Sequence, residues 1–224
     1  LRPHIISRSQ YNEVARAAET IACAIEKLVD AALRDAGLLR SLGLTDREAA
    51  WARIDPGYSR LCGSSRLDAY LSEDGFQFLE YNAETPAGIG DQMQLEKVLF
   101  ELRHMKELLA ERAHWRPEPH RLLLTALLDA YREWGGEEDR PHIAIVDWEG
   151  VSTASEFRIL QAYFAAAGHE TIIVDPRSLT YDGRLKSGDF RIDIAYKRVI
   201  INEFLECCDD DHPLARAYAD GRVC

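Results

Sequence analysis

The chain has 224 residues, with 27 Lys and Arg against 38 Asp and Glu, so its formal net charge at pH 7 is −11. This acidic balance argues against binding to nucleic acid or to an anionic membrane surface, because the field of the protein repels phosphate. A hydrophobic fraction of 46% excludes a disordered chain, and no apolar run approaches the roughly eighteen residues of a membrane span. The five cysteines lack C-x-x-C spacing, which disfavours a disulfide scaffold and leads us to expect a cytoplasmic protein.

Helical periodicity dominates the N-terminal region. Apolar residues recur at three- and four-residue steps, which predicts a helix from Ser9 to about Leu42 with Ser9 as its N-cap. Thr45 and Glu48 have the spacing of a capping box and predict a short second helix. Two more helices are expected, over residues 92–112 and 121–134.

A strand–helix–strand succession follows Gly135 and Gly136. The expected elements are a strand at 142–146, a helix at 154–167 and strands at 171–174 and 192–196. Such a succession implies parallel pairing through a right-handed crossover. The fold class is therefore predicted to be α/β, with a helical N-terminal region, a β-hairpin and a Rossmann-like parallel-sheet unit.

The hairpin is expected between two strand-like runs, 66–71 and 76–82. A three-residue loop ending at Gly75 fits a type I turn followed by a left-handed glycine. With that loop, Asp68 would pair with Glu80, Arg66 with Asn82, and Tyr70 with Phe78. The other face of the hairpin would then be mostly apolar, formed by Leu67, Ala69, Leu71, Tyr81, Leu79 and Gln77. A two-residue turn is the alternative, and it would shift the register and split the polar cluster between the faces.

The polar face of this hairpin has the composition of a magnesium and phosphate site. Two carboxylates directly opposite one another repel, whereas a cation between Asp68 and Glu80 would reverse that effect. Magnesium prefers one or two carboxylates completed by water and phosphate. Asn82 would add a carbonyl oxygen, and Arg66 a fixed positive fork for a phosphoryl or acyl-phosphate oxygen. The alternative interpretation is an ordinary solvated strand face.

The motif pair R-L-D at 66–68 and E-Y-N-A-E-T-P at 80–86 resembles the synthetase domain of glutathionylspermidine synthase and related circularly permuted ATP-grasp proteins. The resemblance implies that Arg66 is the catalytic arginine and that Asp68, Glu80 and Asn82 bind magnesium. The sequence departs from the family at Glu84, where Asp is usual.

The resemblance also implies a domain organisation and an activity. Residues 1–140 would form the helical region and catalytic hairpin, 141–205 a pre-ATP-grasp substrate-binding unit, and 206–224 a connection to a missing ATP-grasp core. The chain would then be the N-terminal part of an ATP-dependent carboxylate–amine ligase, inactive in isolation. It would use Mg²⁺, ATP as co-substrate, and small-molecule carboxylate and amine substrates. The alternative is a non-catalytic binding module that keeps the fold, and the sequence does not indicate an oligomeric state.

Weaker substrate contacts are expected near two strand ends. Ser152 and Ser155 lie where a strand passes into a helix, and amides at a helix N-terminus can hold a carboxylate. The plainer interpretation, which we favour, is a capping box formed by Thr153 and Glu156. Arg198, at the end of another strand, could bind an anionic substrate or simply flank a charged loop.

Two further motifs predict no chemistry. Gly88-Ile89-Gly90 lacks the third glycine and the expected strand–turn–helix context of a dinucleotide fingerprint, which argues against a nicotinamide-dependent enzyme. Cys62 is interpreted as a buried small residue rather than a nucleophile.

Overall fold

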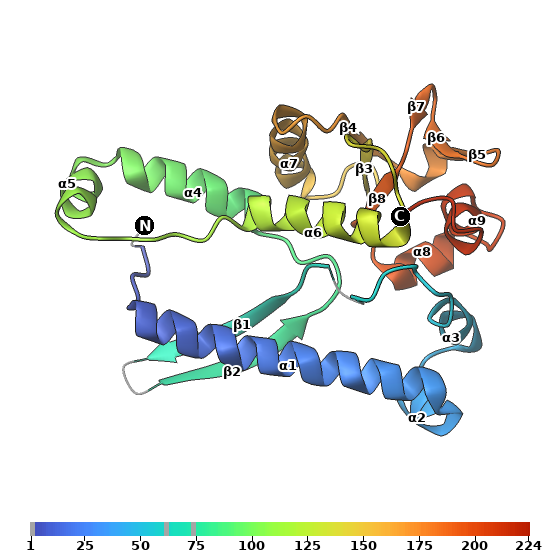
Figure 1. The fold of residues 1–224 in the computed structure, drawn as a ribbon, viewed down its shortest axis with the longest axis horizontal. Helices are drawn as coiled ribbons and strands as arrows, with labels where there is room; N and C mark the ends of the chain where they lie inside the picture. The colour runs from blue at the N-terminus through green and yellow to red at the C-terminus, as the bar shows by residue number, and fades with distance from the viewer. Residues whose placement is uncertain (1–2, 61–62, 73–74) are drawn as a thin grey trace.

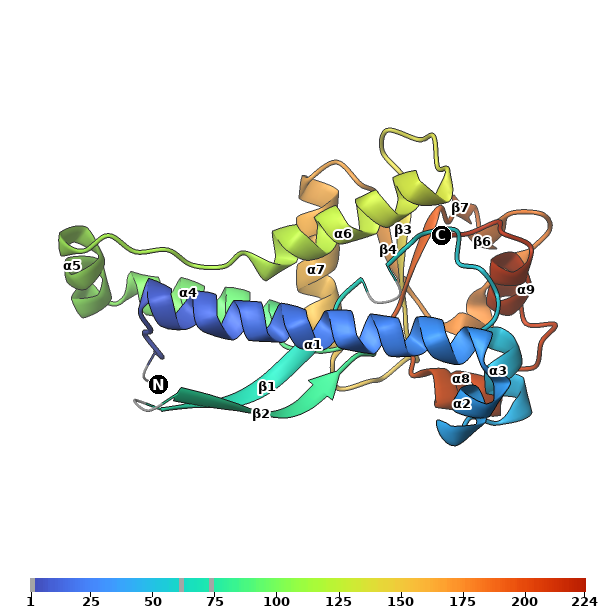
Figure 2. The same cartoon turned by 60° about the horizontal axis from the view of Figure 1, so that its bottom comes forward.

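The computed structural model describes residues 3–60, 63–72 and 75–224. A hairpin of β1 (Arg66–Ser72) and β2 (Gly75–Asn82) lies beside the long helix α1 (Arg8–Arg34) in both views (Figures 1 and 2). A parallel-sheet unit, drawn in brown to red, forms the opposite part of the molecule (Figure 1). Cys62 and the first two residues of the expected turn, Glu73 and Asp74, lie outside the described residues.

The first predicted helix is divided into two. Helix α1 is capped by Ser7 rather than Ser9, and it ends before Asp35. The Asp35 side chain accepts hydrogen bonds from the next backbone amides and caps α2 (Ala36–Ser41). A short polar side chain competes in this way with the helical backbone, which explains the break. The expected capping box is confirmed at the start of α3 (Asp46–Trp51).

The helices that follow the hairpin also include one unexpected break. Leu102 has an extended backbone and separates α4 (Ile89–Glu101) from α5 (Arg103–Glu111) within the span predicted as one helix. Helix α4 begins against α7 (Ala154–Ala166) and runs outward from it, and α5 lies at the far end, away from the rest of the molecule (Figures 1 and 2). Helix α6 (Pro119–Trp134) is confirmed and ends at Gly135, whose φ of 99° suits a glycine C-cap.

The parallel unit is confirmed. Strand β3 (Ile143–Val146) lies between β4 (Thr171–Val174) and β8 (Ile194–Lys197), and both pairings are parallel. Helix α7 (Ala154–Ala166) makes the crossover from β3 to β4. All four residues of β3 are buried, as expected for a strand covered on both faces. The α/β fold class predicted from the sequence is therefore correct.

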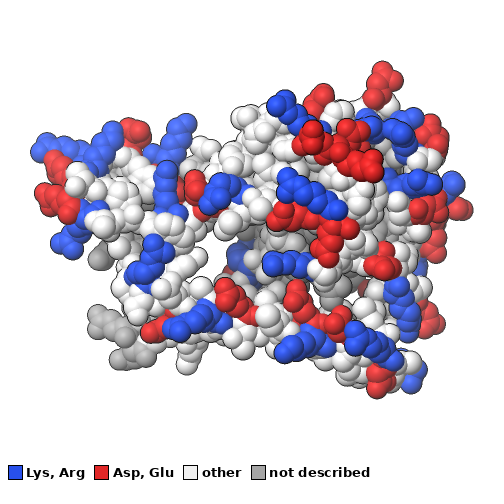
Figure 3. Space-filling view, viewed as in Figure 1, with Lys and Arg blue, Asp and Glu red and all other residues white. Residues whose placement is uncertain are grey.

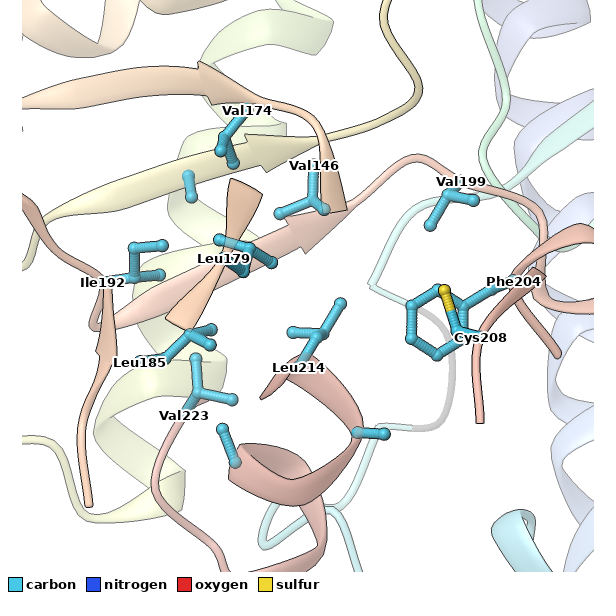
Figure 4. Close-up of a cluster of buried hydrophobic side chains, with 13 residues drawn as sticks. Val146, Val174, Leu179, Leu185, Ile192, Val199, Phe204, Cys208, Leu214 and Val223 are labelled. Carbon is cyan, nitrogen blue, oxygen red and sulfur yellow. The ribbon is translucent and has the colours of Figure 1, made fainter. Parts of the chain in front are cut away.

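Two hydrophobic clusters cover the two faces of this sheet. Ile143 and Ile145 belong to the cluster that includes residues of α6 and α7. Ala144 and Val146, whose side chains alternate with these, belong to the other cluster (Figure 4). That second cluster takes in residues of α8 (Ile201–Cys207) and α9 (Pro213–Ala219).

Residues 206–224, for which the sequence predicts only a connection, are therefore part of this unit. Leu214 of α9 is buried in the cluster. The backbone of Cys224 accepts a hydrogen bond from Ala195 at 2.8 Å and donates one to Asp193 at 3.1 Å, so it pairs alongside β8.

Several short elements were not predicted. The 3₁₀ turn η1 (Pro176–Ser178) precedes a small antiparallel sheet of β5 (Thr180–Tyr181), β6 (Leu185–Ser187) and β7 (Phe190–Arg191). Runs of two or three residues are too short to show a period in the sequence. Within the described part of the chain, no helix has the length and apolar character needed to cross a membrane.

Candidate functional site

The hairpin register brings the two acids of the motif together. Asp68 pairs with Glu80 and Arg66 with Asn82, as the sequence predicts. Nearer the turn the prediction is wrong, because Ser72 pairs with Gly75 and Tyr70 pairs with Gln77 instead of Phe78. A β-bulge between Asp68 and Ala69, which leaves Leu79 on β2 without a partner, reconciles the two registers.

The bulge also changes the composition of the apolar face. With Leu79 as the extra residue, Phe76 and Phe78 share a face with Leu71, and both are half-buried. Their rings are in edge-to-face contact at 5.4 Å. Leu79 and Gln77, which were expected on this face, are exposed. The bulge thus exchanges these two residues for two phenylalanines, which bury more apolar surface.

The four polar side chains of the other face make direct contacts. The Arg66 Nε and Nη2 atoms donate to the two carboxylate oxygens of Asp68 at 2.6 and 3.2 Å. Nη2 also lies 4.0 Å from Glu80 Oε1. The Asn82 side-chain amide donates to the same Glu80 oxygen at 2.9 Å. Arg66, Asp68, Glu80 and Asn82 are therefore one hydrogen-bonded cluster.

The Arg66 guanidinium reduces the repulsion between the paired carboxylates. Its hydrogen bonds lower the pKa of Asp68 below the ordinary value for a carboxyl group, and the same bonds raise the pKa of Arg66. All of these side chains keep contact with solvent, with 36% of Asp68 and 59% of Glu80 exposed. The cluster can therefore exchange internal partners for a ligand.

The donor set fits magnesium in part. Two carboxylates and one amide oxygen are hard ligands of the kind that Mg²⁺ takes, with water and phosphate supplying the remainder. No group of three or more His, Cys, Asp or Glu side chains suited to a metal occurs among residues 3–60, 63–72 and 75–224. The hairpin site thus fits a cation that arrives with phosphate better than one held by protein alone.

The loop after β2 is anchored to the parallel unit. Glu84 forms an ion pair with Lys197 at the end of β8, and its carboxylate accepts a hydrogen bond from the backbone of Ile201 at 2.9 Å. The Arg198 Nη1 atom donates to the Pro86 carbonyl at 2.8 Å. The E-T-P half of the motif therefore joins the hairpin to the sheet.

A glutamate of α7 occupies the N-terminus of α4. Glu156 is buried, and its Oε2 atom accepts a hydrogen bond from the Gly88 amide at 2.6 Å. Gly88 is the N-cap of α4, with φ 109°, so the G-I-G segment does connect a strand to a helix, contrary to expectation. Gly90 allows close approach, since a Cβ there would lie 3.1 Å from the Glu156 Cα atom. A carboxylate of the chain itself therefore fills this anion-binding position.

The weaker candidates are not members of the four-residue hairpin cluster. Ser152 and Ser155 are exposed near the start of α7, where the expected capping box is absent because Thr153 makes no capping bond. Glu156, the predicted partner of Thr153, points instead to Gly88. Arg198 is only 4% exposed and bonds the backbone of the loop, so it does not present its charge to solvent.

A cavity of about 540 Å³ lies next to the anchored loop. Figure 3 shows this side of the molecule hollowed below α6. The wall combines apolar side chains of α6 with polar groups of the loop and of β8, among them Glu84, Thr85, Leu123, Leu127, Tyr196 and Lys197. Tyr58 and Cys224 also line it, and burial raises the pKa of each to about 12, so the cavity contains no activated thiolate from Cys224 at neutral pH.

Comparisons with known proteins were made at the level of families, curated sequences and solved structures. No protein-family profile matches the sequence, and no curated protein matches it. Among solved structures, the chain is similar to a glutathione synthetase-like effector (GSS30) from Globodera pallida in its apo form, with a TM-score of 0.54 and 13% identity. The fold is glutathione synthetase-like.

The extent of the match limits what it shows. It covers 97% of this chain and 55% of the effector chain, so the chain spans about half the length of that structure. At 13% identity the likeness shows the fold alone. The likeness is therefore to a glutathione synthetase-like fold, and it does not single out glutathionylspermidine synthase.

Proposed function

We propose that this chain is the N-terminal part of an ATP-dependent carboxylate–amine ligase that acts through an acyl phosphate. The observation that carries the proposal is the cross-strand register of the hairpin, which gathers two acids, an amide and an arginine on one exposed face. The glutathione synthetase-like fold supports the same reaction class. The R-x-D and E-Y-N motifs favour a relative of glutathionylspermidine synthase within that class.

Each residue of the cluster has a defined role in the proposal. Asp68, Glu80 and Asn82 would hold Mg²⁺ through their side-chain oxygens. Mg²⁺, when bound, offsets the negative charge of the ATP phosphates. Arg66 would turn part of its guanidinium from Asp68 to the transferred phosphoryl group and neutralise charge that develops there. Its Nη1 atom would keep the Ala87 carbonyl, 2.8 Å away, as a fixed point.

The cavity beside the anchored loop is the proposed place for an organic substrate. Its volume of about 540 Å³ is within the range of small-molecule sites. Ser152 and Ser155 do not line this cavity, so they remain proposed contacts only for a substrate carboxylate that reaches the N-terminus of α7, where both are exposed. The burial of Arg198 suits it to holding the backbone of the loop at Pro86 rather than to binding a substrate.

ATP turnover by the intact protein tests this proposal. Phosphate release is measured with Mg·ATP and a panel of small carboxylates and amines, and replacement of Glu80 by Gln should abolish it. The matched control is Glu107→Gln, which removes an exposed acid on α5 that pairs with Arg103. Near-normal turnover by the Glu80 variant would refute the assignment.

A non-catalytic binding module is the second candidate. It is favoured by the ion pair in which Arg66 already neutralises Asp68. This candidate predicts no ATP turnover by the intact protein with any substrate pair. Isothermal titration of the 224-residue chain with Mg·ATP tests this part of the protein by itself, which should bind nucleotide weakly or not at all without an ATP-grasp core.

A further inference from the structure

Three consecutive residues of the anchored loop are each bound to a different charged side chain. The Pro86 carbonyl accepts from Arg198 Nη1 at 2.8 Å, the Ala87 carbonyl accepts from Arg66 Nη1 at 2.8 Å, and the Gly88 amide donates to Glu156 at 2.6 Å. Two of these side chains come from the parallel unit and one from the hairpin. The segment Pro86–Gly88 is therefore the direct link between Arg66 and the two buried charges.

Arg198 and Glu156 are held in place by burial. Arg198 is 4% exposed and Glu156 is 3% exposed. The Arg198 guanidinium lies 5.5 Å from the ring centre of Phe157, and it donates to the Tyr196 hydroxyl at 3.2 Å. Charges removed from water are costly unless they are well paired. Arg198 Nε and Glu156 Oε1 nevertheless have no hydrogen-bond partner among the described residues, so packing of the chain alone does not satisfy these groups.

The backbone of the same loop has few alternative conformations. Thr85 has φ 47°, a left-handed value that costs a non-glycine residue free energy. Pro86 fixes its own φ and is buried. The surroundings must therefore hold this shape, and the Arg198 and Glu156 bonds on either side of Ala87 contribute to this together with the bonds of Glu84.

We propose that Glu156 and Arg198 are positioning residues for Arg66, because they fix the Pro86–Gly88 backbone whose Ala87 carbonyl orients the Arg66 guanidinium. The inference rests on the proposed role of Arg66 at the hairpin site. The Arg66 side chain is 45% exposed, and long exposed side chains sample many rotamers. With Nη1 held by the loop, Nε and Nη2 stay directed at Asp68 and Glu80.

The Arg66 Nε–H signal in ¹H–¹⁵N NMR spectra tests the inference without any activity. The signal is assigned by its loss in Arg66→Lys. The variants Arg198→Lys and Glu156→Gln should shift it or broaden it beyond detection, while circular dichroism shows the fold retained. The control Arg177→Lys removes an exposed guanidinium that pairs with Asp175, and it should leave the Arg66 signal in place. An unchanged Arg66 signal in folded Arg198 and Glu156 variants would overturn the proposal.

The reciprocal experiment avoids substitution of buried groups. Arg66→Lys lies on an exposed strand position and removes the planar fork that contacts Ala87 and Asp68 together. It should shift the Gly88 amide signal, whose proton is bonded to Glu156. Arg121→Lys on α6, which pairs with Glu118, is the matched control and should leave that signal unmoved. No movement of the Gly88 amide in Arg66→Lys would contradict the coupling.

The two proposals fail in different ways. If Glu156→Gln moves the Arg66 signal but the intact protein never turns over ATP, then the positioning holds and the ligase function does not. If ATP turnover is found but the Arg66 signal is insensitive to both buried variants, then the ligase function holds and Glu156 and Arg198 do not position Arg66.

Discussion

Asp68 and Glu80 are direct cross-strand partners although the pairs between them and the turn follow a different register. The extra residue Leu79 makes this possible, because it takes up the difference in register between Asp68 and Ala69. The acid pair depends on this bulge as much as on the turn.

Deletion of Leu79 should therefore be tolerated. Without it, Ala69 still pairs with Phe78 and Asp68 still pairs with Glu80, now in a regular ladder. We expect the free energy of unfolding in urea to change by less than about 1 kcal/mol, and a cross-strand NOE to persist between Asp68 and Glu80. Under the unbulged register the same deletion would separate the two acids and abolish the NOE.

Deletion of Gln77 is the matched comparison. It also leaves Asp68 opposite Glu80, but it moves Phe78 from the apolar face to the exposed face, opposite Tyr70. Leu79 then takes the place of the half-buried ring on the apolar face, opposite Ala69, so the net loss in the free energy of unfolding should be no more than about 1 kcal/mol. Equal stability of the two deletion variants would show that the position of Phe78 is unimportant.

Replacement of Gly90 by Ala tests the contact between α4 and α7. The new Cβ would lie 3.0 Å from Glu156 Cγ and 3.1 Å from its Cα, so one of the helices must shift. Overpacking of this kind costs about 1–3 kcal/mol in chemical denaturation. Gly63→Ala is the control, because a Cβ there meets nothing within 4 Å. If the Gly90 variant is as stable as the control, the helices are less closely fixed than their geometry indicates.

The ion pair between Glu84 and Lys197 should be weak and sensitive to salt. Both side chains are about one third exposed, so Glu84→Gln should cost roughly 0.5–1 kcal/mol at low ionic strength. The difference from the unmodified protein should shrink as salt is added, because salt screens the pair. Lys197→Gln should not add to the loss in the double variant. Additive losses would show that the two groups act independently.

Asp175 should make stability depend on pH in the acid range. Hydrogen bonds from Arg177 hold the pKa of the Asp175 carboxyl well below its usual value. A lowered pKa in the folded state stabilises the fold above the unfolded-state pKa near 3.9, and this contribution is lost as pH falls through the folded-state pKa. Asp175→Asn should thus lower the free energy of unfolding by about 1–2 kcal/mol at pH 7. In urea titrations, the difference in the free energy of unfolding between the unmodified protein and Asp175→Asn should decrease below about pH 4. A difference that does not change with pH would show that the Asp175 carboxylate does not stabilise the fold in this way.

The sequence predicts the parallel unit well because its signals are long or repeated. Helices α6 and α7 each span enough residues to show a helical period, and β3 is a continuous apolar run of the kind typical of a strand covered on both faces. The strands β5, β6 and β7 have two or three residues each and offer no such signal. Helix α9 is also short, and its burial depends on the sheet against which it packs.

The sequence predicts the candidate site only where the contacts follow from the alternation of side chains along the two strands. Alternation along strands places Arg66, Asp68, Glu80 and Asn82 together, and the structure gathers them as expected. The role of Glu156 could not be foreseen, because its capping-box spacing gives a local explanation while its actual partner, Gly88, is 68 residues away. Burial of Arg198 likewise results from packing against Pro86 and Phe157, which sequence spacing does not reveal.

The bulge at Leu79 has a consequence for comparing other sequences with this one. The twelve-residue separation between Asp68 and Glu80 fits a three-residue turn with a regular ladder, and it fits equally well a two-residue turn with one bulged residue. The separation alone does not distinguish these two backbone structures, because both place the same acids opposite one another. A homologue that lacks one residue at Leu79 can still place the two acids opposite one another. An alignment gap at this position is therefore no reason to conclude that a sequence lacks the acid pair.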